Sequence, residues 1–508
     1  MRFVSLLCVT FFCATFFSCH ERKEKSSTHI HFDNVAAWSK KEYSLSHRRI
    51  RSVIDRLRRG TVRMYADEFT HGYYASEAPF LWITRQGVDN KADTLLAHIK
   101  ETRPIGLHAE VFHIAELEEN LRRIRQLDFD HLHDINTVFG RTEYLLTEAY
   151  LRYVCGQRFG YVKPGIVFNR LEKADITPKS PFIKLFDVDL EQANEDFISR
   201  SLACLNQNTL SSFLKDTEPD APLYRQLTAL YNQTQDSSLR RKIVANIERS
   251  RWRPTYTQHR KHIRVNLAGA TLQAINEETQ DSLYMKICYG SRKNKTPLLH
   301  SRIERIDMNP YWNIPFSIIK KEIAPRHAGD AAYFARNRYR ILDKESGKEL
   351  SPEKVSASML LSGDYRIRQD NGEGNSLGRL IFRFPNNFSI YLHDTNNKQA
   401  FKRKDRAISH GCIRVEKPLE LAVFLLEEPD EKTVNKLRKA IGLPLLNEPA
   451  PQKKKEEEDV KTEFLRLKPT IPVFIEYRTL CPKKDGEWEE HPDPYGYDEI
   501  LLKKLESF

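Results

Sequence analysis

The chain changes from a helical to a strand-like hydrophobic pattern near its middle. Apolar residues recur at helical spacing in the stretches 50–57, 94–99, 117–127, 142–151, 186–214 and 223–231. After Pro254, apolar and polar residues alternate, as in half-buried strands, in the runs 263–267, 271–275 and 283–287. The pattern predicts an α+β protein with a mostly helical domain over residues 45–250 and a β-rich domain over residues 258–508.

Two long insertions interrupt the strand pattern of the second half. Residues 320–377 are mixed in charge and contain several glycines and prolines, which predicts a long loop. Residues 447–463 include three lysines followed by three glutamates, a composition that cannot support a core and predicts a solvated linker. Helices are expected at 419–427 and 434–441, and a late strand at 470–477.

The first nineteen residues have the composition of a secretory signal. A positively charged start precedes an apolar run from Phe3 to Phe17, which is short for a membrane-spanning helix. Cys19 follows it and resembles the lipidated cysteine of bacterial lipoproteins. We therefore expect export, lipidation at Cys19 and a polar tether over residues 20–44, with an uncleaved anchor as the alternative.

The cysteines and histidines show no metal-ligand spacing. There is no CxxC motif, so neither a structural zinc site nor a disulfide framework is expected. If Cys19 is lipidated and Cys412 is a free nucleophile, four cysteines remain outside the leader, with three complete pairings or none: Cys155, Cys204, Cys288 and Cys481. The histidines of the helical half are expected to be solvated or satisfied: His98, His108, His113, His131 and His133.

The residue types needed for cysteine catalysis are concentrated around Cys412. A free thiol has a pKa of about 8.5, so a nucleophilic cysteine needs a nearby imidazole to take its proton. His393 ends an apolar, β-rich run that would hold it rigidly, and His410 lies two positions before the thiol. Gly411 allows a tight turn, so the N–H groups of Gly411 and Cys412 could point at a developing oxyanion. The pattern predicts a cysteine acyl-transfer site.

Arg414 completes this cluster. It lies two positions beyond the thiol on an extended segment, so it would face the same side, where its planar fork suits a substrate carboxylate. A lone cysteine is usually a small core residue, and a lone arginine is usually solvated. The catalytic interpretation is favoured because histidine, glycine, cysteine and arginine fall within five positions, and because a predicted strand that ends in histidine precedes them in the sequence.

This segment resembles the signature of YkuD-type L,D-transpeptidases. Further landmarks resemble the larger members of that family, which carry a helical scaffold domain and a lid near the active site: 261–267, 295–297, 309–315, 368–370, 375–378, 470–477 and 493–498. The resemblance implies that residues 320–377 are this lid. The match is strong over about 240–508 and weak over the N-terminal half. Larger members often carry a peptidoglycan-binding module, and we expect it to be missing here because residues 231–233 lead almost directly into 243–249.

The resemblance implies a cysteine-dependent enzyme of cell wall biogenesis and cell shape. It would form an acyl-enzyme with a peptidoglycan tetrapeptide stem, release D-alanine and transfer the stem to an amine, giving a 3→3 cross-link. Water or a wall-anchored protein remains open as the acceptor. The implied partners are donor and acceptor stems, with other wall-synthesis proteins, and the implied location is the periplasm. No cofactor and no metal are implied.

The same resemblance implies a role for each site residue. His393 would take the proton of Cys412. His410 and Ser409 would shape the cleft or orient the first imidazole, and Arg414 would hold a carboxylate of the donor stem. Asp394 would assist through its carboxylate or its backbone, and Tyr391 would pack at the substrate site.

Two other interpretations stay open. A papain-like cysteine hydrolase shares the thiol and imidazole, but its cysteine precedes its histidine, which is the reverse of the order here. A wall-binding lipoprotein with a dead site would keep the fold, yet every candidate catalytic residue is present. The net charge of +12 is spread along the 508 residues without a nucleic-acid-binding signature, so we expect no nucleic-acid partner.

Overall fold

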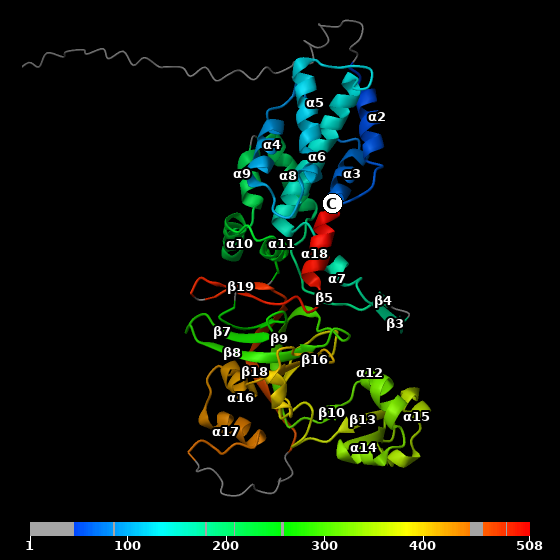
Figure 1. Cartoon of the computed structure of the whole chain (residues 1–508), viewed down its shortest axis with the longest axis vertical. Coiled ribbons are helices and arrows are strands. Elements are labelled where there is room, and N and C mark those ends of the chain that lie inside the picture. Colours follow the sequence, from blue (N-terminus) through cyan, green and yellow to red (C-terminus); the bar gives the residue numbers. More distant parts are fainter. Residues whose placement is uncertain are drawn as a thin grey trace, which may run out of the picture.

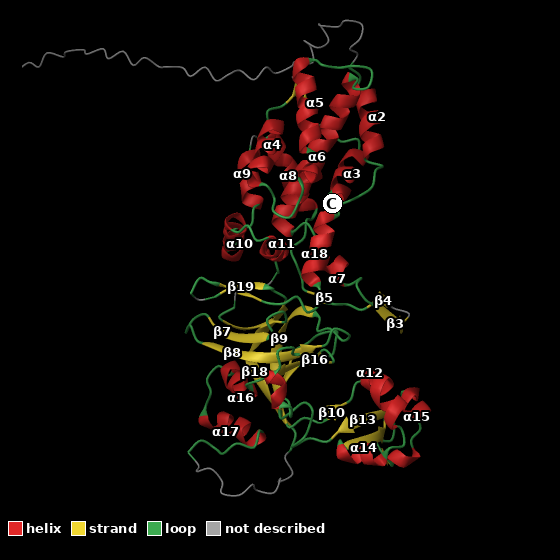
Figure 2. Cartoon of the chain, viewed as in Figure 1, coloured by secondary structure: helices red, strands yellow, loops and turns green. Residues whose placement is uncertain are grey.

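The computed structural model describes residues 45–84, 87–177, 180–207, 209–255, 259–447, 461–483 and 485–508. The predicted signal peptide, the lipidated Cys19, the tether and most of the charged linker therefore lie outside the described residues. Within the described ranges, no helix combines the length and the apolar character that a membrane span requires. The molecule is elongated, with the helical first half at one end and the strands of the second half, accompanied by shorter helices, toward the other (Figures 1 and 2).

The helical end is built around one long helix, α6 (Ile135–Phe159), whose residues from 142 to 157 are all buried. A helix buried on all its faces lies at the centre of a bundle. Its neighbours are α2 (His47–Leu57), α3 (Asp67–Ala75), α4 (Lys91–Thr102), α5 (Ile114–Gln126), α8 (Glu195–Asn206) and α9 (Leu210–Thr217). Further along the chain come α7 (Pro164–Phe168), α10 (Pro222–Gln233) and α11 (Ser237–Arg251).

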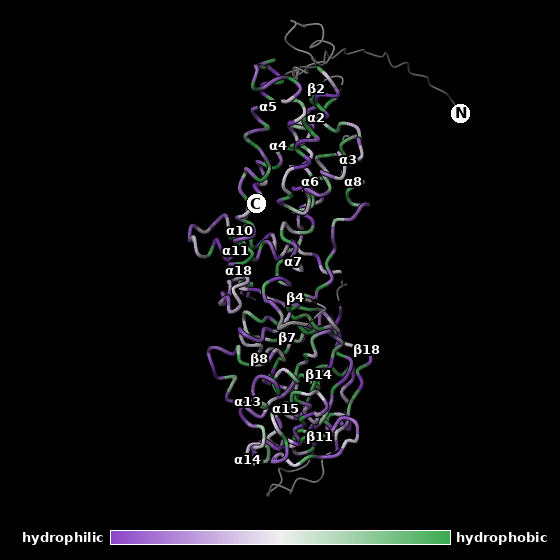
Figure 3. Tube along the Cα trace, turned by 90° about the vertical axis from the view of Figure 1, so that its right-hand side faces the viewer, coloured by the Kyte–Doolittle hydropathy of each residue, from purple (hydrophilic) through white to green (hydrophobic). Residues whose placement is uncertain are grey.

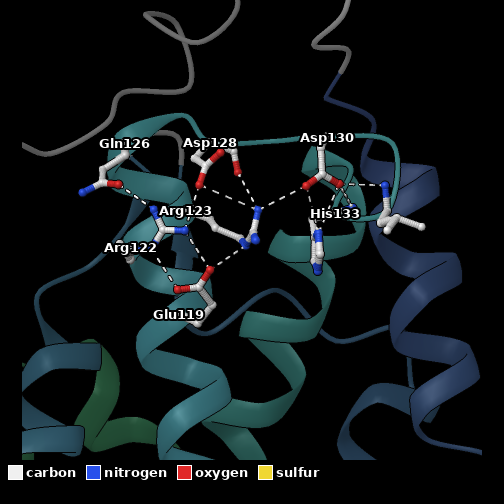
Figure 4. Close-up of polar contacts among 8 residues, drawn as sticks. Glu119, Arg122, Arg123, Gln126, Asp128, Asp130 and His133 are labelled. Carbon is white, nitrogen blue, oxygen red and sulfur yellow. Dashed lines mark hydrogen bonds and ion pairs between the residues drawn. The ribbon is translucent and has the colours of Figure 1, made fainter.

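Charged side chains hold the turn between α5 and α6 (Figure 4). Arg122 pairs with Glu119 at 2.7 Å and with Asp128 at 2.8 Å. His133 contacts Asp130 at 3.1 Å, so its imidazole is part of this network. No group of His, Cys, Asp and Glu suited to a metal ion occurs in the part of the chain that the structure describes.

The strands of the second half close into a barrel. The order along the sheet is β14 (Leu380–Arg383), β15 (Leu392–His393), β17 (Ile413–Val415), β8 (Ser282–Gly290), β7 (Thr271–Asn276), β6 (Lys261–Asn266), β18 (Glu463–Glu476) and β9 (Leu298–Met308). β9 also pairs with β14, which closes the ring. Because side chains alternate along each strand, one face of each strand points into the barrel, where Ile306, Phe382, Leu392 and Ile413 are buried.

Residues 312–369 form a small folded unit, which we call the inserted subdomain. It contains β10 (Trp312–Asn313), α12 (Phe316–Ile318), the π-helical turn η2 (Ile319–Ile323), α13 (Ala324–His327), α14 (Ala331–Arg336), β11 (Tyr339–Asp343), β12 (Glu349–Leu350), η3 (Pro352–Lys354), α15 (Ala357–Ser362) and β13 (Tyr365–Gln369). Its strands pair in the order β10-β13-β11-β12, over a separate core that includes Phe334, Ile341 and Ile367. The predicted insertion is present, but its prediction as a long loop is wrong, because the glycines lie at turns between short apolar elements.

The helical and strand halves are connected by elements that cross between them. β5 (Phe186–Asp187) pairs with β9 at the edge of the barrel sheet, so the helix predicted from position 186 is wrong at its start. The C-terminal helix α18 (Tyr497–Glu506) returns to pack against α11, and the C-terminus lies beside the bundle (Figure 1). Arg241 of α11 pairs with Glu499 at 3.1 Å and with Glu506 at 2.8 Å.

The remaining elements are short. They are β1 (Ile83–Thr84), β2 (Gly87–Val88), η1 (Ala109–Phe112), β3 (Lys173–Thr177), β4 (Ser180–Phe182), η4 (Lys398–Lys402), β16 (Ala407–Ser409), α16 (Pro418–Leu425), α17 (Glu431–Ala440), β19 (Leu480–Pro482) and β20 (Trp488–Glu490). The expected helices near 419 and 434 and the late strand are thus present. Hydrophobic and hydrophilic positions are interspersed along the whole trace, as expected for elements that bury one face (Figure 3).

Candidate active site

Four of the predicted site residues share the outer face of the barrel on two neighbouring strands. β15 and β17 run parallel, with Leu392 paired to Ile413 and His393 paired to Arg414. Since Leu392 and Ile413 point into the barrel, the alternate residues point outward. Tyr391 therefore lies beside Cys412, and His393 beside Arg414, so the thiol and the His393 ring are diagonal neighbours.

The thiol of Cys412 contacts Tyr391 rather than an imidazole. Burial raises the pKa of Cys412 to about 11, and hydrogen bonds from the Tyr391 backbone N–H and hydroxyl act in the opposite direction. Burial and the neighbouring Cys412 also raise the pKa of the Tyr391 hydroxyl. Packing is the role expected of Tyr391, and the structure adds a hydrogen bond from its hydroxyl to the thiol. Its position two residues before His393 on one strand brings its hydroxyl to the sulfur.

His393 is buried and held as a neutral ring. Burial first, and then the Arg414 charge, lower its pKa to about 4, although the carbonyls of Asp394 and Leu377 favour the proton. Its Nδ1 is hydrogen-bonded to the Asp394 carbonyl, which requires the ring proton on Nδ1 and leaves Nε2 as the basic atom. Among the described residues, no hydrogen bond joins His393 to Cys412.

Asp394 acts at this site through both its backbone and its carboxylate. Its carbonyl accepts the His393 bond, and its Oδ2 accepts the backbone N–H of Arg379 at 2.9 Å. Its other oxygen pairs with Lys398. The residue thus fixes the imidazole through its carbonyl and the adjoining loop through its carboxylate.

The turn before Cys412 is fixed by hydroxyl groups. Gly411 has φ +120°, a conformation that favours glycine. Its N–H donates to Ser409 Oγ at 3.1 Å, and Ser409 Oγ donates to the Cys412 carbonyl. The Gly411 N–H is therefore engaged by Ser409 in this structure, and its role as an oxyanion donor stays a prediction. In the described part of the chain, the Cys412 N–H has no backbone acceptor and is free for that role.

Thr296 fixes the Gly411 carbonyl from behind. Its Oγ1 donates to Gly411 O at 2.8 Å and accepts the Gly290 N–H at 2.9 Å. The Thr296 N–H donates to the Tyr495 hydroxyl at 3.0 Å. Because the carbonyl and the next N–H lie on opposite sides of one planar peptide, Thr296 sets the direction of the Cys412 N–H. The sequence shows Thr296 as part of a family landmark but does not reveal this contact.

His410 points to the inserted subdomain. Its Nε2 lies 2.5 Å from Glu322 Oε1, and both side chains are exposed. In the described residues no hydrogen bond joins His410 to His393, so of its two predicted roles, shaping the cleft or orienting the first imidazole, the second has no contact to support it. Glu322 belongs to the turn η2, and nothing in the local sequence pattern connects it to this histidine.

Arg414 is a mostly buried cation without a carboxylate partner among the described residues. Its Nε is buried and has no hydrogen-bond partner. Burial lowers its pKa, whereas the neighbouring Cys288 and Cys412 raise it. An arginine in this state matches the predicted role of holding a carboxylate. All five described cysteines are free, so none of the possible pairings is formed.

Known proteins resemble both halves of the chain. Residues 260–436 match the family described as the YkuD L,D-transpeptidase catalytic domain, and residues 67–230 match the family described as a scaffold domain. A protein of Haemophilus influenzae named "Putative L,D-transpeptidase" is 30% identical over 313 residues, which are 61% of this chain. The chain spans 59% of the length of that relative. Neither matched family is a peptidoglycan-binding module, in agreement with the expectation from the sequence.

Proposed function

We propose that the chain is a peptidoglycan L,D-transpeptidase with Cys412 as nucleophile, because residues 260–436 match the YkuD L,D-transpeptidase catalytic domain and residues 67–230 match a scaffold domain. The observation that carries this proposal is the outward cluster in which Cys412 lies beside Tyr391 and diagonal to a neutral His393. The thiolate attacks the carbonyl of the third residue of a tetrapeptide stem, and D-alanine leaves with a proton.

The thiol of Cys412 and the imidazole of His393 are both uncharged at rest. The thiol is protonated because burial raises the pKa of Cys412 to about 11, and the pKa of His393 near 4 keeps the imidazole neutral. Proton transfer from sulfur to Nε2 therefore has to occur with the substrate in place, and the Tyr391 hydroxyl stabilises the thiolate that forms. The imidazolium then gives its proton to the departing amine.

The second half-reaction resolves the thioester. An acceptor amine forms a bond to the acyl carbon, the C–S bond breaks, and the sulfur recovers a proton by way of His393. A diamino acid as acceptor gives the 3→3 cross-link, and water gives a shortened stem. In both steps the Cys412 N–H stabilises the oxyanion, and Arg414 holds a carboxylate of the donor.

The proposal includes location at the cell envelope. Its support is the composition of the leader, with an apolar run ahead of Cys19. A lipid on Cys19 would tether the enzyme to a membrane, with the helical domain between the tether and the barrel. Metabolic labelling with a palmitate analogue, compared between the natural chain and Cys19→Ala, tests this part.

The enzymatic proposal is tested with disaccharide-tetrapeptide and mass spectrometry. Residues 20–508 should release D-alanine and form dimers, and Cys412→Ala should do neither. Cys481→Ala is the matched control, because this free cysteine lies on β19, away from the cluster, and it should behave as the unsubstituted protein does. Release of D-alanine by Cys412→Ala would refute the assignment, and no release by the unsubstituted protein would favour a dead site.

A further inference from the structure

Three arginines stand in one row across neighbouring strands on the outer face of the barrel. Arg383 of β14 is paired with Arg305 of β9, and Arg305 is paired with Arg466 of β18. Like charges directly opposite each other on a sheet are destabilising. A folded chain that keeps three of them in register therefore suggests a ligand that compensates the repulsion.

The row is only partly neutralised from within the protein. Arg305 Nε lies 2.9 Å from Asp307 Oδ1, and Arg383 Nε contacts Oδ2 of the same carboxylate. Among the described residues, Arg466 has no carboxylate within ion-pair distance. One carboxylate against three guanidinium groups leaves two positive charges. Arg305 and Arg466 lie 5.5 Å and 5.8 Å from the ring centre of Phe464.

The row is accessible to a large ligand. The Arg305 side chain is 43% exposed, and Arg383 is 36% exposed. Phe464 is 53% exposed, although it is a large apolar residue between two cations. An exposed aromatic ring beside arginine forks offers an apolar contact next to two bidentate anion sites.

The row ends at the proposed nucleophile. The Arg383 guanidinium lies 4.9 Å from the centre of the Tyr391 ring, and the Tyr391 hydroxyl contacts Cys412. Arg383 also lowers the pKa of the Cys412 thiol. A chain bound along the row would thus place its end at the sulfur.

The order of the strands assigns the row to the second substrate. Arg414 lies on β17, next to β8, whereas the row begins on β14, on the far side of β15. If Arg414 holds the carboxylate of the donor stem, the opposite side of the site, which begins at Arg383, is left for the acceptor stem that attacks the thioester.

We propose that the arginine row, Arg383, Arg305 and Arg466 with Phe464, binds the carboxylates of the acceptor stem peptide. The inference rests on the proposed function and adds the subsite for the second strand. A stem with free carboxyl groups presents several anions at peptide spacing, which the forks of a row of arginines can bind one by one. Bound there, the acceptor competes with water for the acyl-enzyme.

The test measures how the acyl-enzyme is partitioned between the two acceptors. Residues 20–508 receive disaccharide-tetrapeptide as donor and a tripeptide stem as acceptor, and the ratio of dimer to hydrolysed product is followed by mass spectrometry. The double variant Arg305→Glu with Arg466→Glu should lower this ratio about tenfold. A purely structural defect would lower both products together and leave the ratio unchanged.

A matched control separates local from overall charge. Arg49→Glu with Lys503→Glu makes the same change in net charge at side chains that are 61% and 72% exposed and far from the barrel row. It should keep the ratio of the unsubstituted protein. If the double glutamate variant does not fold, Arg466→Gln provides a milder test, because it replaces an exposed charge with an uncharged side chain. It should still lower the ratio of dimer to hydrolysed product severalfold.

An acceptor stem with amidated carboxyl groups gives a second arm. The unsubstituted protein should use it about as poorly as the double variant uses the free acid, and the double variant should not discriminate between the two stems. Equal ratios for the unsubstituted protein and the double variant would overturn the inference, as would hydrolysis without any dimer. Absence of D-alanine release from the unsubstituted protein would instead refute the proposed function.

Discussion

Replacing Thr296 with valine tests how the turn before Cys412, the proposed nucleophile, is held. Valine has nearly the same shape as threonine but lacks the hydroxyl, and position 296 is fully buried. The hydroxyl serves two backbone groups, the Gly411 carbonyl at 2.8 Å and the Gly290 N–H at 2.9 Å. Thr296→Val therefore leaves one acceptor and one donor without a partner inside the protein.

The expected magnitude follows from these two groups. Each buried polar group left without a partner costs about 1–3 kcal/mol, so the free energy of unfolding should fall by about 2–6 kcal/mol. The Gly411–Cys412 peptide also loses the contact that orients it. If the Cys412 N–H is the oxyanion donor, release of D-alanine should fall about 100-fold, since one such donor is worth about 10²–10³ in rate.

Thr296→Ser is the matched control. It keeps the hydroxyl and removes one methyl group, which costs about 1 kcal/mol of stability, and it should keep the rate within about threefold. Urea denaturation measures the stability, and D-alanine release from disaccharide-tetrapeptide measures the rate. Both are measured at 25 °C, after circular dichroism has shown that each variant is folded. A folded Thr296→Val protein with the unsubstituted rate would refute the idea that this peptide must be oriented for catalysis.

Three further outcomes are expected. Tyr391→Phe removes the hydroxyl that contacts the Cys412 thiol, so the pKa of that thiol should rise above about 11 and D-alanine release should fall about tenfold. The pKa is measured from the rate of thiol alkylation as a function of pH, and an unchanged pKa would show that the contact is unimportant. Only a neutral imidazole accepts a proton, and burial lowers the pKa of His393 from 6.5 to about 4. In a profile of kcat/KM against pH, the loss of activity on the acid side should therefore have its midpoint near pH 4, and a midpoint near pH 6.5 would contradict this. Between pH 6.5 and 4 the His393 ring is protonated in the unfolded chain but neutral in the folded chain, so the free energy of unfolding should be highest above pH 6.5 and fall as the pH decreases toward 4. Gly378→Ala would place a Cβ 2.4 Å from the Asp394 carboxyl at φ +65°, so activity and melting temperature should both fall, and an unchanged melting curve would refute the close approach.

Local patterns were sufficient for much of this protein. The spacing of apolar residues predicts the helices of the first half and the strands that follow residue 261, because periodicity of 3.6 or 2 is a property of neighbours along the chain. The cluster around Cys412 is likewise visible, because glycine, histidine, cysteine and arginine fall within five positions. The inserted subdomain escaped this reasoning because its elements are too short to show a period.

The sequence by itself predicted Cys412 as the nucleophile and an imidazole on the preceding strand, and its motifs identified the L,D-transpeptidase resemblance. The tertiary structure alone decided which groups touch, because contacts between strands depend on register and on pairs far apart in the chain. Register placed Tyr391 beside Cys412 and moved His393 to the diagonal. Closure of the barrel aligned Arg305, Arg383 and Arg466. No local pattern predicts this row, because its three strands are neighbours in the sheet but far apart in the sequence.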